Sequence, residues 1–178
     1  METIKVHDKE FASFISPKEI EQAVEKIANN INNDLKDKNP LFLVVLNGAF
    51  MFASDLFKKI TIPCEISFVK LSSYIGTQST SAVRELIGLD EVLRDRAVVI
   101  VEDIIDTGIT MGVTTDKLKK LEAKEVYIAT LLFKPDAFKM NYNINYIGIK
   151  IPNDFIVGYG LDYDGHGRNH PEIFKIIE

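Results

Sequence analysis

Three acidic residues gather in one short stretch of the chain, at Glu102, Asp103 and Asp106. They follow residues 98–101, an unbroken apolar run that is typical of a central parallel strand buried on both faces. We therefore expect the acids at the carboxyl end of such a strand. Because crowded carboxylates repel one another, a cation or a hydroxyl-rich ligand is the expected reason for their grouping.

Small and hydroxyl-bearing residues come next, namely Thr107, Gly108 and Thr110. The apolar spacing that follows predicts a helix over residues 112–123. A turn of this kind places backbone N–H groups at the positive end of a helix, which suits a phosphate group. Acids and a phosphate-binding turn at one strand end indicate a phosphorylated sugar that is accompanied by a metal ion.

The sequence Val-Glu-Asp-Ile-Ile-Asp-Thr-Gly at residues 101–108 is similar to the motif with which type I phosphoribosyltransferases bind phosphoribosyl diphosphate (PRPP). Its form resembles most the hypoxanthine(-guanine) branch of that family. The resemblance implies that Glu102 and Asp103 hold the ribose hydroxyls, partly through Mg²⁺. It also implies that Asp106 is the general base that accepts the N7 proton of a purine, a role that a raised carboxylate pKa would suit.

By the same resemblance, Thr107, Gly108, Ile109 and Thr110 cradle the 5-phosphate of PRPP. Family members often carry Lys or Asn at the position of Ile109. The departure in this chain means that phosphate binding would depend on backbone amides and on the threonine hydroxyls.

A second transition from strand to turn lies at residues 41–48. Leu46, Asn47 and Gly48 match the family loop that contacts the pyrophosphate half of PRPP, and a helix is expected over residues 50–59. The family often has Lys where this chain has Asn47, so backbone N–H groups would make the contact. Relatives can hold this peptide bond strained or cis. Without the resemblance, a simple strand-to-helix turn explains these residues equally well.

The second specific signature covers residues 152–163. Phe155 matches an aromatic residue that stacks on the base. Ile156 matches the residue whose backbone reads the purine edge, and Asp162 matches a carboxylate that holds a second Mg²⁺ through water and lies near the base. The resemblance therefore gives Glu102 and Asp103 one metal-binding role and Asp162 another.

Two basic residues complete the implied site. Lys134 follows an expected buried strand at residues 126–133, and strand ends of open α/β sheets are where ligands bind. It matches the lysine that hydrogen-bonds the exocyclic oxygen of a 6-oxopurine, although a solvated surface lysine is the alternative without the family. Arg168 matches an arginine that reaches pyrophosphate. The residues around it, 165–167 and 169–171, depart from the usual family pattern.

Residues 71–81 are small and polar, and Ser73 with Tyr74 matches the Ser-Tyr pair of the flexible family loop that closes over the site. A mobile surface loop is the alternative. Residues 83–88 are expected to form a strand of a hairpin that extends from this loop.

The predicted fold is α/β, one phosphoribosyltransferase domain over residues 1–178 with a parallel sheet flanked by helices. The core is expected over about residues 16–133, and a small hood over about residues 1–15 and 134–178. Ser16 begins a helix, with Pro17 at its first position and Glu19 closing a capping box. The asparagine-rich residues 29–33 are expected to fray its end.

Other classes fit less well. A P-loop NTPase needs a Gly-rich phosphate loop that the sequence does not contain. An aspartic protease, indicated by the Asp-Thr-Gly at residues 106–108, needs an all-β framework. A regulator on the same fold that binds PRPP and a nucleic acid needs a basic face, which the net charge of −5 disfavours. The remaining alternative is that the three acids have no ligand and simply lie at a strand end that faces solvent.

The implied activity is transfer of a phosphoribosyl group from PRPP to hypoxanthine or guanine in purine salvage, which yields IMP or GMP and pyrophosphate. The sequence does not rank hypoxanthine, guanine and xanthine. No apolar run approaches the roughly 20 residues of a membrane span, and the single cysteine, Cys64, fits a reducing cytoplasm. We expect no nucleic-acid or membrane partner. Relatives assemble as homodimers or homotetramers, and the same is expected here.

Overall fold

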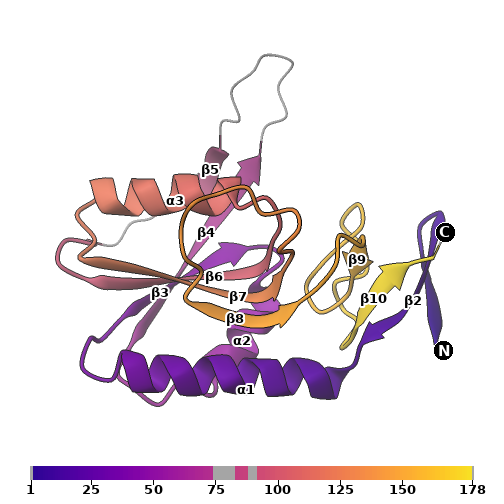
Figure 1. Ribbon diagram of the computed structural model, residues 1–178, viewed down its shortest axis with the longest axis horizontal. Coiled ribbons are helices and arrows are strands. Elements are labelled where there is room, and N and C mark those ends of the chain that lie inside the picture. The colour runs from indigo at the N-terminus through magenta and orange to yellow at the C-terminus, as the bar shows by residue number, and fades with distance from the viewer. Residues whose placement is uncertain (1, 74–82, 88–91, 178) are drawn as a thin grey trace.

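The computed structural model describes residues 2–73, 83–87 and 92–177, and the side chains of 72–73 and 83–87 are left aside. Over these residues the chain forms two sheets (Figure 1). The larger has the strand order β5-β4-β3-β6-β7-β8. Its strands are β3 (Leu41–Leu46), β4 (Glu65–Ser73), β5 (Val83–Ile87), β6 (Ala97–Ile105), β7 (Glu125–Phe133) and β8 (Tyr146–Lys150).

All neighbours in the larger sheet are parallel except β5, which pairs antiparallel with β4 at one edge. This arrangement confirms the predicted parallel sheet and the predicted hairpin strand. The central strands β3 and β6 are buried on both faces, as their continuous apolar sequences indicate. Alternate residues of each strand enter two separate hydrophobic clusters.

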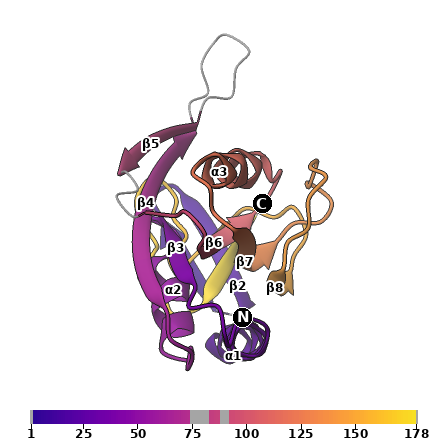
Figure 2. The ribbon, with the colours of Figure 1, turned by 90° about the vertical axis from the view of Figure 1, so that its left-hand side faces the viewer.

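Helices cover both faces of this sheet. α1 (Pro17–Asp34) and α2 (Phe50–Phe57) pack on one face, and α3 (Ile109–Lys120) packs on the other (Figures 1 and 2). Among the described residues, no helix has the length and the apolar character that crossing a bilayer requires.

The start of α1 is as predicted. The Ser16 side chain accepts a hydrogen bond from the Glu19 N–H, and the Glu19 carboxylate accepts one from the Ser16 N–H. The predicted fraying of its end is wrong. Asn32 lies inside the helix, donates to the Lys59 carbonyl at 3.0 Å and accepts from the Thr61 N–H at 2.9 Å. It thereby joins α1 to the segment that follows α2.

The smaller sheet is antiparallel, with the order β1-β2-β10-β9. Its strands are β1 (Thr3–Val6), β2 (Lys9–Ile15), β9 (Ile156–Val157) and β10 (Ile173–Ile176). It lies beyond one end of the larger sheet, at the right of Figure 1, and has its own small apolar cluster. This sheet corresponds to the hood that the sequence predicts.

The predicted hood boundary at residue 134 is placed too early. β8 is the last strand of the larger sheet, so the C-terminal part of the hood begins after Lys150. Gly148 lets β8 approach both neighbours closely, because a Cβ there would lie 2.6 Å from the Leu131 carbonyl oxygen and 3.3 Å from Ala23 of α1. β8 is thus held closely between β7 and α1.

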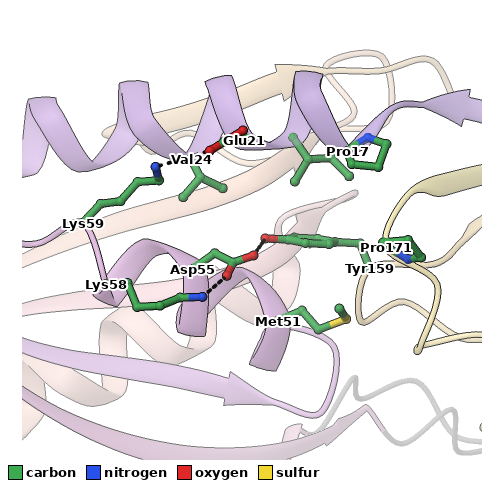
Figure 3. A pocket seen from close by; sticks show the side chains of 10 residues that line it. Pro17, Glu21, Val24, Met51, Asp55, Lys58, Lys59, Tyr159 and Pro171 are labelled. Carbon is green, nitrogen blue, oxygen red and sulfur yellow. Dashed lines mark hydrogen bonds and ion pairs between the residues drawn. The ribbon is translucent and has the colours of Figure 1, made fainter.

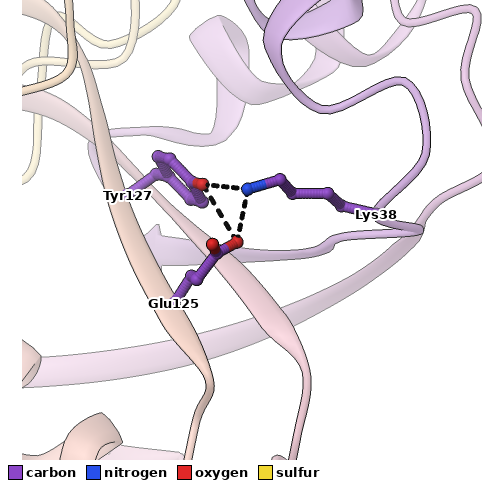
Figure 4. A network of polar contacts seen from close by, with 3 residues as sticks. All are labelled: Lys38, Glu125 and Tyr127. Atoms are coloured by element: carbon purple, nitrogen blue, oxygen red, sulfur yellow. Dashed lines mark hydrogen bonds and ion pairs between the residues drawn. The ribbon is translucent and has the colours of Figure 1, made fainter.

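A polar network lies at the end of the sheet where β3 and β7 begin (Figure 4). The Lys38 ammonium donates to Glu125 at 2.6 Å and to the Tyr127 hydroxyl at 2.7 Å, and Tyr127 donates to Glu125 at 3.0 Å. Exposed pairs of this kind contribute about 1 kcal/mol at most. The predicted site residues Glu102, Asp103 and Lys134 lie at the opposite, carboxyl ends of the strands.

Candidate active site

The acids of the central motif lie at the carboxyl end of β6, between β3 and β7. The sequence predicts that the strand ends in Glu102 and Asp103, whereas β6 continues to Ile105. Glu102 pairs with Thr130 in the parallel ladder, and Ile104 pairs with Leu132. The extension holds both acids on a rigid strand rather than on a loop.

Glu102 and Asp103 are crowded and poorly solvated. Asp103 is 9% exposed, and the enclosed Oε2 of Glu102 has no hydrogen-bond partner among the described residues. Burial, with a second contribution from the neighbouring Asp103 charge, raises the pKa of Glu102 well above its ordinary value. Burial also raises the pKa of Asp103, although the Ile104 N–H, donating at 2.8 Å, opposes the rise.

This pair fits a hard cation. An orphaned carboxylate oxygen beside a second buried carboxylate is the donor set that Mg²⁺ prefers, because it binds oxygen ligands and one or two carboxylates in most protein sites. Asp162 does not join the pair. In the part of the chain that the structure describes, no three His, Cys, Asp or Glu side chains are grouped closely enough to hold one ion.

The turn after β3 lies directly against the acid pair. The Asp103 carboxylate occupies the space where a Gly48 side chain would begin, so only glycine leaves room for it. The peptide bond between Leu46 and Asn47 is cis. Gly160 of the hood also lies close to Gly48, because a Cβ at Gly160 would overlap the Gly48 carbonyl oxygen. Three segments that are distant in sequence therefore meet at Gly48.

The turn from Asp106 to α3 has the shape of an anion site. Gly108 is the N-cap residue that precedes α3, has φ of 80°, and supplies no side-chain hydrogen bond to the helix. Its carbonyl accepts a hydrogen bond of 2.6 Å from the Tyr142 hydroxyl. The Ile109 N–H has only a long contact of 3.5 Å with the Thr107 hydroxyl. Backbone donors at the positive helix end thus remain available to an anion.

A cavity of about 140 Å³ lies beside this turn and extends to Glu102 of the acid pair. Its lining includes Glu102, Asp106, Thr107, Gly108 and Thr110. The structure therefore brings together the residues that the sequence assigns to ribose and phosphate.

Phe138 and Tyr142 also shape this turn, and sequence reasoning missed both. A Cβ at Gly108 would lie 2.4 Å from the Phe138 ring and 2.8 Å from the Tyr142 hydroxyl. The two rings pack edge to face at 5.3 Å between centroids. They occur in the connection between β7 and β8, where no periodic pattern marks them.

Lys134 lies at the carboxyl end of β7, as predicted, and its N–H donates to the Ile105 carbonyl at 2.9 Å. Its ammonium donates to Asp106 Oδ2 at 3.2 Å. The lysine is buried, at 9% exposed, whereas Asp106 is half-exposed. The proposed base-reading lysine and the proposed general base are therefore direct neighbours.

The hood loop supplies the remaining predicted residues. Phe155 is 45% exposed and presents an open ring, and Ile156 begins β9. Arg168 forms an ion pair with Asp162 Oδ1 at 2.7 Å and donates to the Gly160 carbonyl at 2.7 Å. Asp162 also accepts from the Gly165 N–H at 2.7 Å. Arg168 and Asp162 are thus tied to the loop that approaches Gly48.

Only the predicted lid lies beyond reach of the structure. Ser73 is the last residue of β4, and its side chain is not described. Tyr74 lies outside the described residues.

Comparison with known proteins agrees with this geometry. The phosphoribosyl transferase domain family matches residues 15–164. The chain belongs to the phosphoribosyltransferase family. It is 41% identical over 166 residues to the hypoxanthine phosphoribosyltransferase of Buchnera aphidicola, which covers 92% of this chain and 94% of that protein. It is 37% identical over 162 residues to the hypoxanthine-guanine phosphoribosyltransferase of Mycobacterium tuberculosis, covering 87% and 80%.

Among solved structures, a hypoxanthine phosphoribosyltransferase from Staphylococcus aureus superposes with a TM-score of 0.88 at 34% identity. The match covers 93% of this chain and 90% of that one. The predicted phosphoribosyltransferase fold and family are confirmed, and the protease and P-loop alternatives are excluded.

Proposed function

We propose that this phosphoribosyltransferase is a cytoplasmic purine salvage enzyme, which transfers the 5-phosphoribosyl group of PRPP to N9 of hypoxanthine and guanine and releases IMP or GMP and pyrophosphate. The observation that carries the proposal is the meeting of three strand ends. β3 brings Gly48, β6 brings the acid pair and the phosphate turn, and β7 brings Lys134.

The ribose and its 5-phosphate would bind along β6 and the turn after it. Glu102 and Asp103 would accept hydrogen bonds from the two ribose hydroxyls, because ionised carboxylates are strong acceptors. The backbone amides of residues 107–110 would hold the phosphate at the start of α3. Binding both groups fixes C1 of the sugar near Gly48 and Lys134.

The bond from C1 to pyrophosphate breaks while the new bond to nitrogen is still incomplete, so positive charge develops on the ring. The carboxylates beside the ribose favour this charge electrostatically. Glu102 and Asp103 are also the residues that would hold Mg²⁺, which neutralises the departing pyrophosphate. The Gly48 turn and the Arg168 guanidinium would bind that leaving group.

Lys134 supports the choice of a 6-oxopurine. A lysine ammonium has three donors and no acceptor, so it can bind the exocyclic oxygen of hypoxanthine while it keeps its contact with Asp106. The amino group of adenine is itself a donor toward this position, so the Lys134 N–H that faces the base would find no acceptor there. Asp106, half-exposed beside it, is placed to accept the N7 proton. Phe155 would stack on the base.

The test is PRPP-dependent nucleotide formation with hypoxanthine, guanine, xanthine and adenine as acceptors. We expect IMP and GMP and at most trace AMP. PRPP binding without turnover of any base would refute the proposal and favour a regulator.

We also propose that the enzyme assembles as a homodimer or homotetramer. Phe50 of α2 and Ile66 and Phe68 of β4 expose large apolar surfaces and line one shallow pocket. Exposed apolar patches of this kind mark interfaces. Light scattering during size-exclusion chromatography gives the mass, and a monomer at micromolar concentration would contradict the proposal.

A further inference from the structure

A hydrogen bond behind the proposed active site joins the two halves of the molecule. The Tyr159 hydroxyl, from the loop after β9, donates to Asp55 Oδ2 of α2 at 2.6 Å (Figure 3). Both residues line a cavity of about 510 Å³ between α1, α2 and the hood. Tyr159 is 5% exposed, and Asp55 is also paired with Lys58 at 2.6 Å on its solvent side.

Each end of this bond is connected to a proposed ligand-binding segment. Asp55 lies on α2, which begins immediately after the turn that contains Gly48. Tyr159 is followed by Gly160, which packs against the Gly48 carbonyl and accepts a hydrogen bond from Arg168. The bond therefore links the helix that follows the Gly48 turn to the loop that carries Gly160 and contacts Arg168.

The charge states make this a strong bond. Burial raises the pKa of Tyr159, and the hydrogen bond to Asp55 raises it further, so the hydroxyl keeps its proton. Burial would raise the pKa of Asp55, but the hydrogen bonds from Lys58 and Tyr159 lower it below its ordinary value. A neutral donor meets an ionised acceptor, which is the stronger kind of protein hydrogen bond.

The base-reading end of the same loop is anchored separately. Ile156 and Val157 form β9 and pair with Lys175 and Phe174 of β10. The Gly160 N–H donates to the Arg168 carbonyl at 2.9 Å, so loss of the Tyr159 bond should shift Gly160 and Arg168 together relative to the Gly48 turn and leave the position of Ile156 nearly unchanged.

We propose that Tyr159 and Asp55 are positioning residues for the pyrophosphate half of PRPP: their hydrogen bond fixes the spacing between the Gly48 turn and the Arg168 segment. The inference rests on the proposed function, because it takes pyrophosphate as the group that binds between these segments.

The test compares Tyr159→Phe, Asp55→Ala and the double variant. We expect Tyr159→Phe to raise the KM for PRPP by about tenfold. The dissociation constant of pyrophosphate with Mg²⁺, measured by calorimetry, should rise by about the same factor. This is the usual size of the effect when a hydrogen bond to a charged group is lost. The KM for hypoxanthine should change less than about threefold, because β9 remains paired. The double variant should resemble either single variant, since both remove the same bond.

Three further variants separate this role from others. Tyr163→Phe makes the same chemical change in a tyrosine that donates to Asp8 at 2.9 Å within the hood, and it should leave the KM for PRPP unchanged. Lys58→Gln removes the other partner of Asp55 and should also have little effect. Asp55→Asn keeps an acceptor and should recover part of the pyrophosphate affinity that Asp55→Ala loses.

A structural role alone would lower the melting temperature and the active fraction while both KM values stayed constant, and that result would overturn the inference. Additive effects of Tyr159→Phe and Asp55→Ala, or an equal effect of Tyr163→Phe, would overturn it as well. If the wild-type protein converts no base, the proposed function fails, but pyrophosphate calorimetry on the same variants still decides the positioning role.

Discussion

Replacement of Gly48 by alanine tests the meeting of the three segments directly. The added Cβ would lie 1.6 Å from Asp103 Oδ2, whereas real Cβ contacts essentially never fall below 3.0 Å. The carboxylate or the turn must therefore move by about 1.4 Å or more. A misplacement of about 1 Å near reacting groups costs about a hundredfold in rate.

We expect Gly48→Ala to lower kcat/KM for PRPP by about a hundredfold or more. Overpacking of a tight site also costs about 1–3 kcal/mol of stability, so circular dichroism and thermal unfolding must accompany the kinetics. The matched control is Gly112→Ala in α3, where the added Cβ meets the flexible end of Met140 at 2.9 Å. That variant should keep its activity, and its helix propensity should improve.

The outcome that would refute this reasoning is a folded Gly48→Ala protein with kcat/KM within about threefold of wild type, because a loss of transition-state contacts corresponds to much larger changes. Such a result would mean that the Asp103 carboxylate has no fixed role beside the turn. A large loss in Gly112→Ala would be equally damaging, since it would show that any added methyl group near α3 impairs the enzyme.

Four other predictions concern the acids, Lys134 and Mg²⁺. Lys134→Met should lower kcat/KM for hypoxanthine by at least about tenfold, because it removes a hydrogen bond from a charged donor. The ratio of kcat/KM for hypoxanthine to that for adenine should fall, as assays with both bases would measure. Asp106→Asn should reduce kcat far more than it weakens PRPP binding, and equal losses in both would exclude the general-base role. Glu102→Gln should raise the melting temperature at neutral pH while activity falls. The pKa of Glu102 is raised in the folded state, so the wild type loses stability as pH rises above the unfolded value near 4.5, and the advantage of the variant should vanish at pH 4. Mg²⁺ should raise the melting temperature of the wild type more than that of this variant, as measured by thermal shift. Removal of Mg²⁺ with EDTA should abolish turnover in the activity assay.

Features that depend on neighbouring residues could be read from the sequence. The apolar run at residues 98–101 predicts a strand buried on both faces because each of its side chains is β-branched or aliphatic. The capping box at Ser16 follows from residues three positions apart. The same holds for the phosphate turn, whose glycine and threonines lie in one short segment.

Features that depend on contacts between distant segments could not be predicted from the sequence. The sequence gives no reason to pair Tyr159 with Asp55, or to place Tyr142 on the Gly108 carbonyl. The asparagines at the end of α1 look like helix breakers, but Asn32 finds two backbone partners near Thr61, which reverses the expected effect. The close packing of β8 against β7 and α1 at Gly148 likewise involves residues far away in the sequence.

The Tyr142 hydroxyl on the Gly108 carbonyl has one further consequence. It ties the turn that begins α3, which we propose binds the 5-phosphate, to the connection between β7 and β8. The conformational entropy of that loop is therefore lost during folding and not during substrate capture. Tyr142→Phe should slow recognition of every 5-phosphorylated sugar alike, because it would return disorder to a surface that meets only the phosphate.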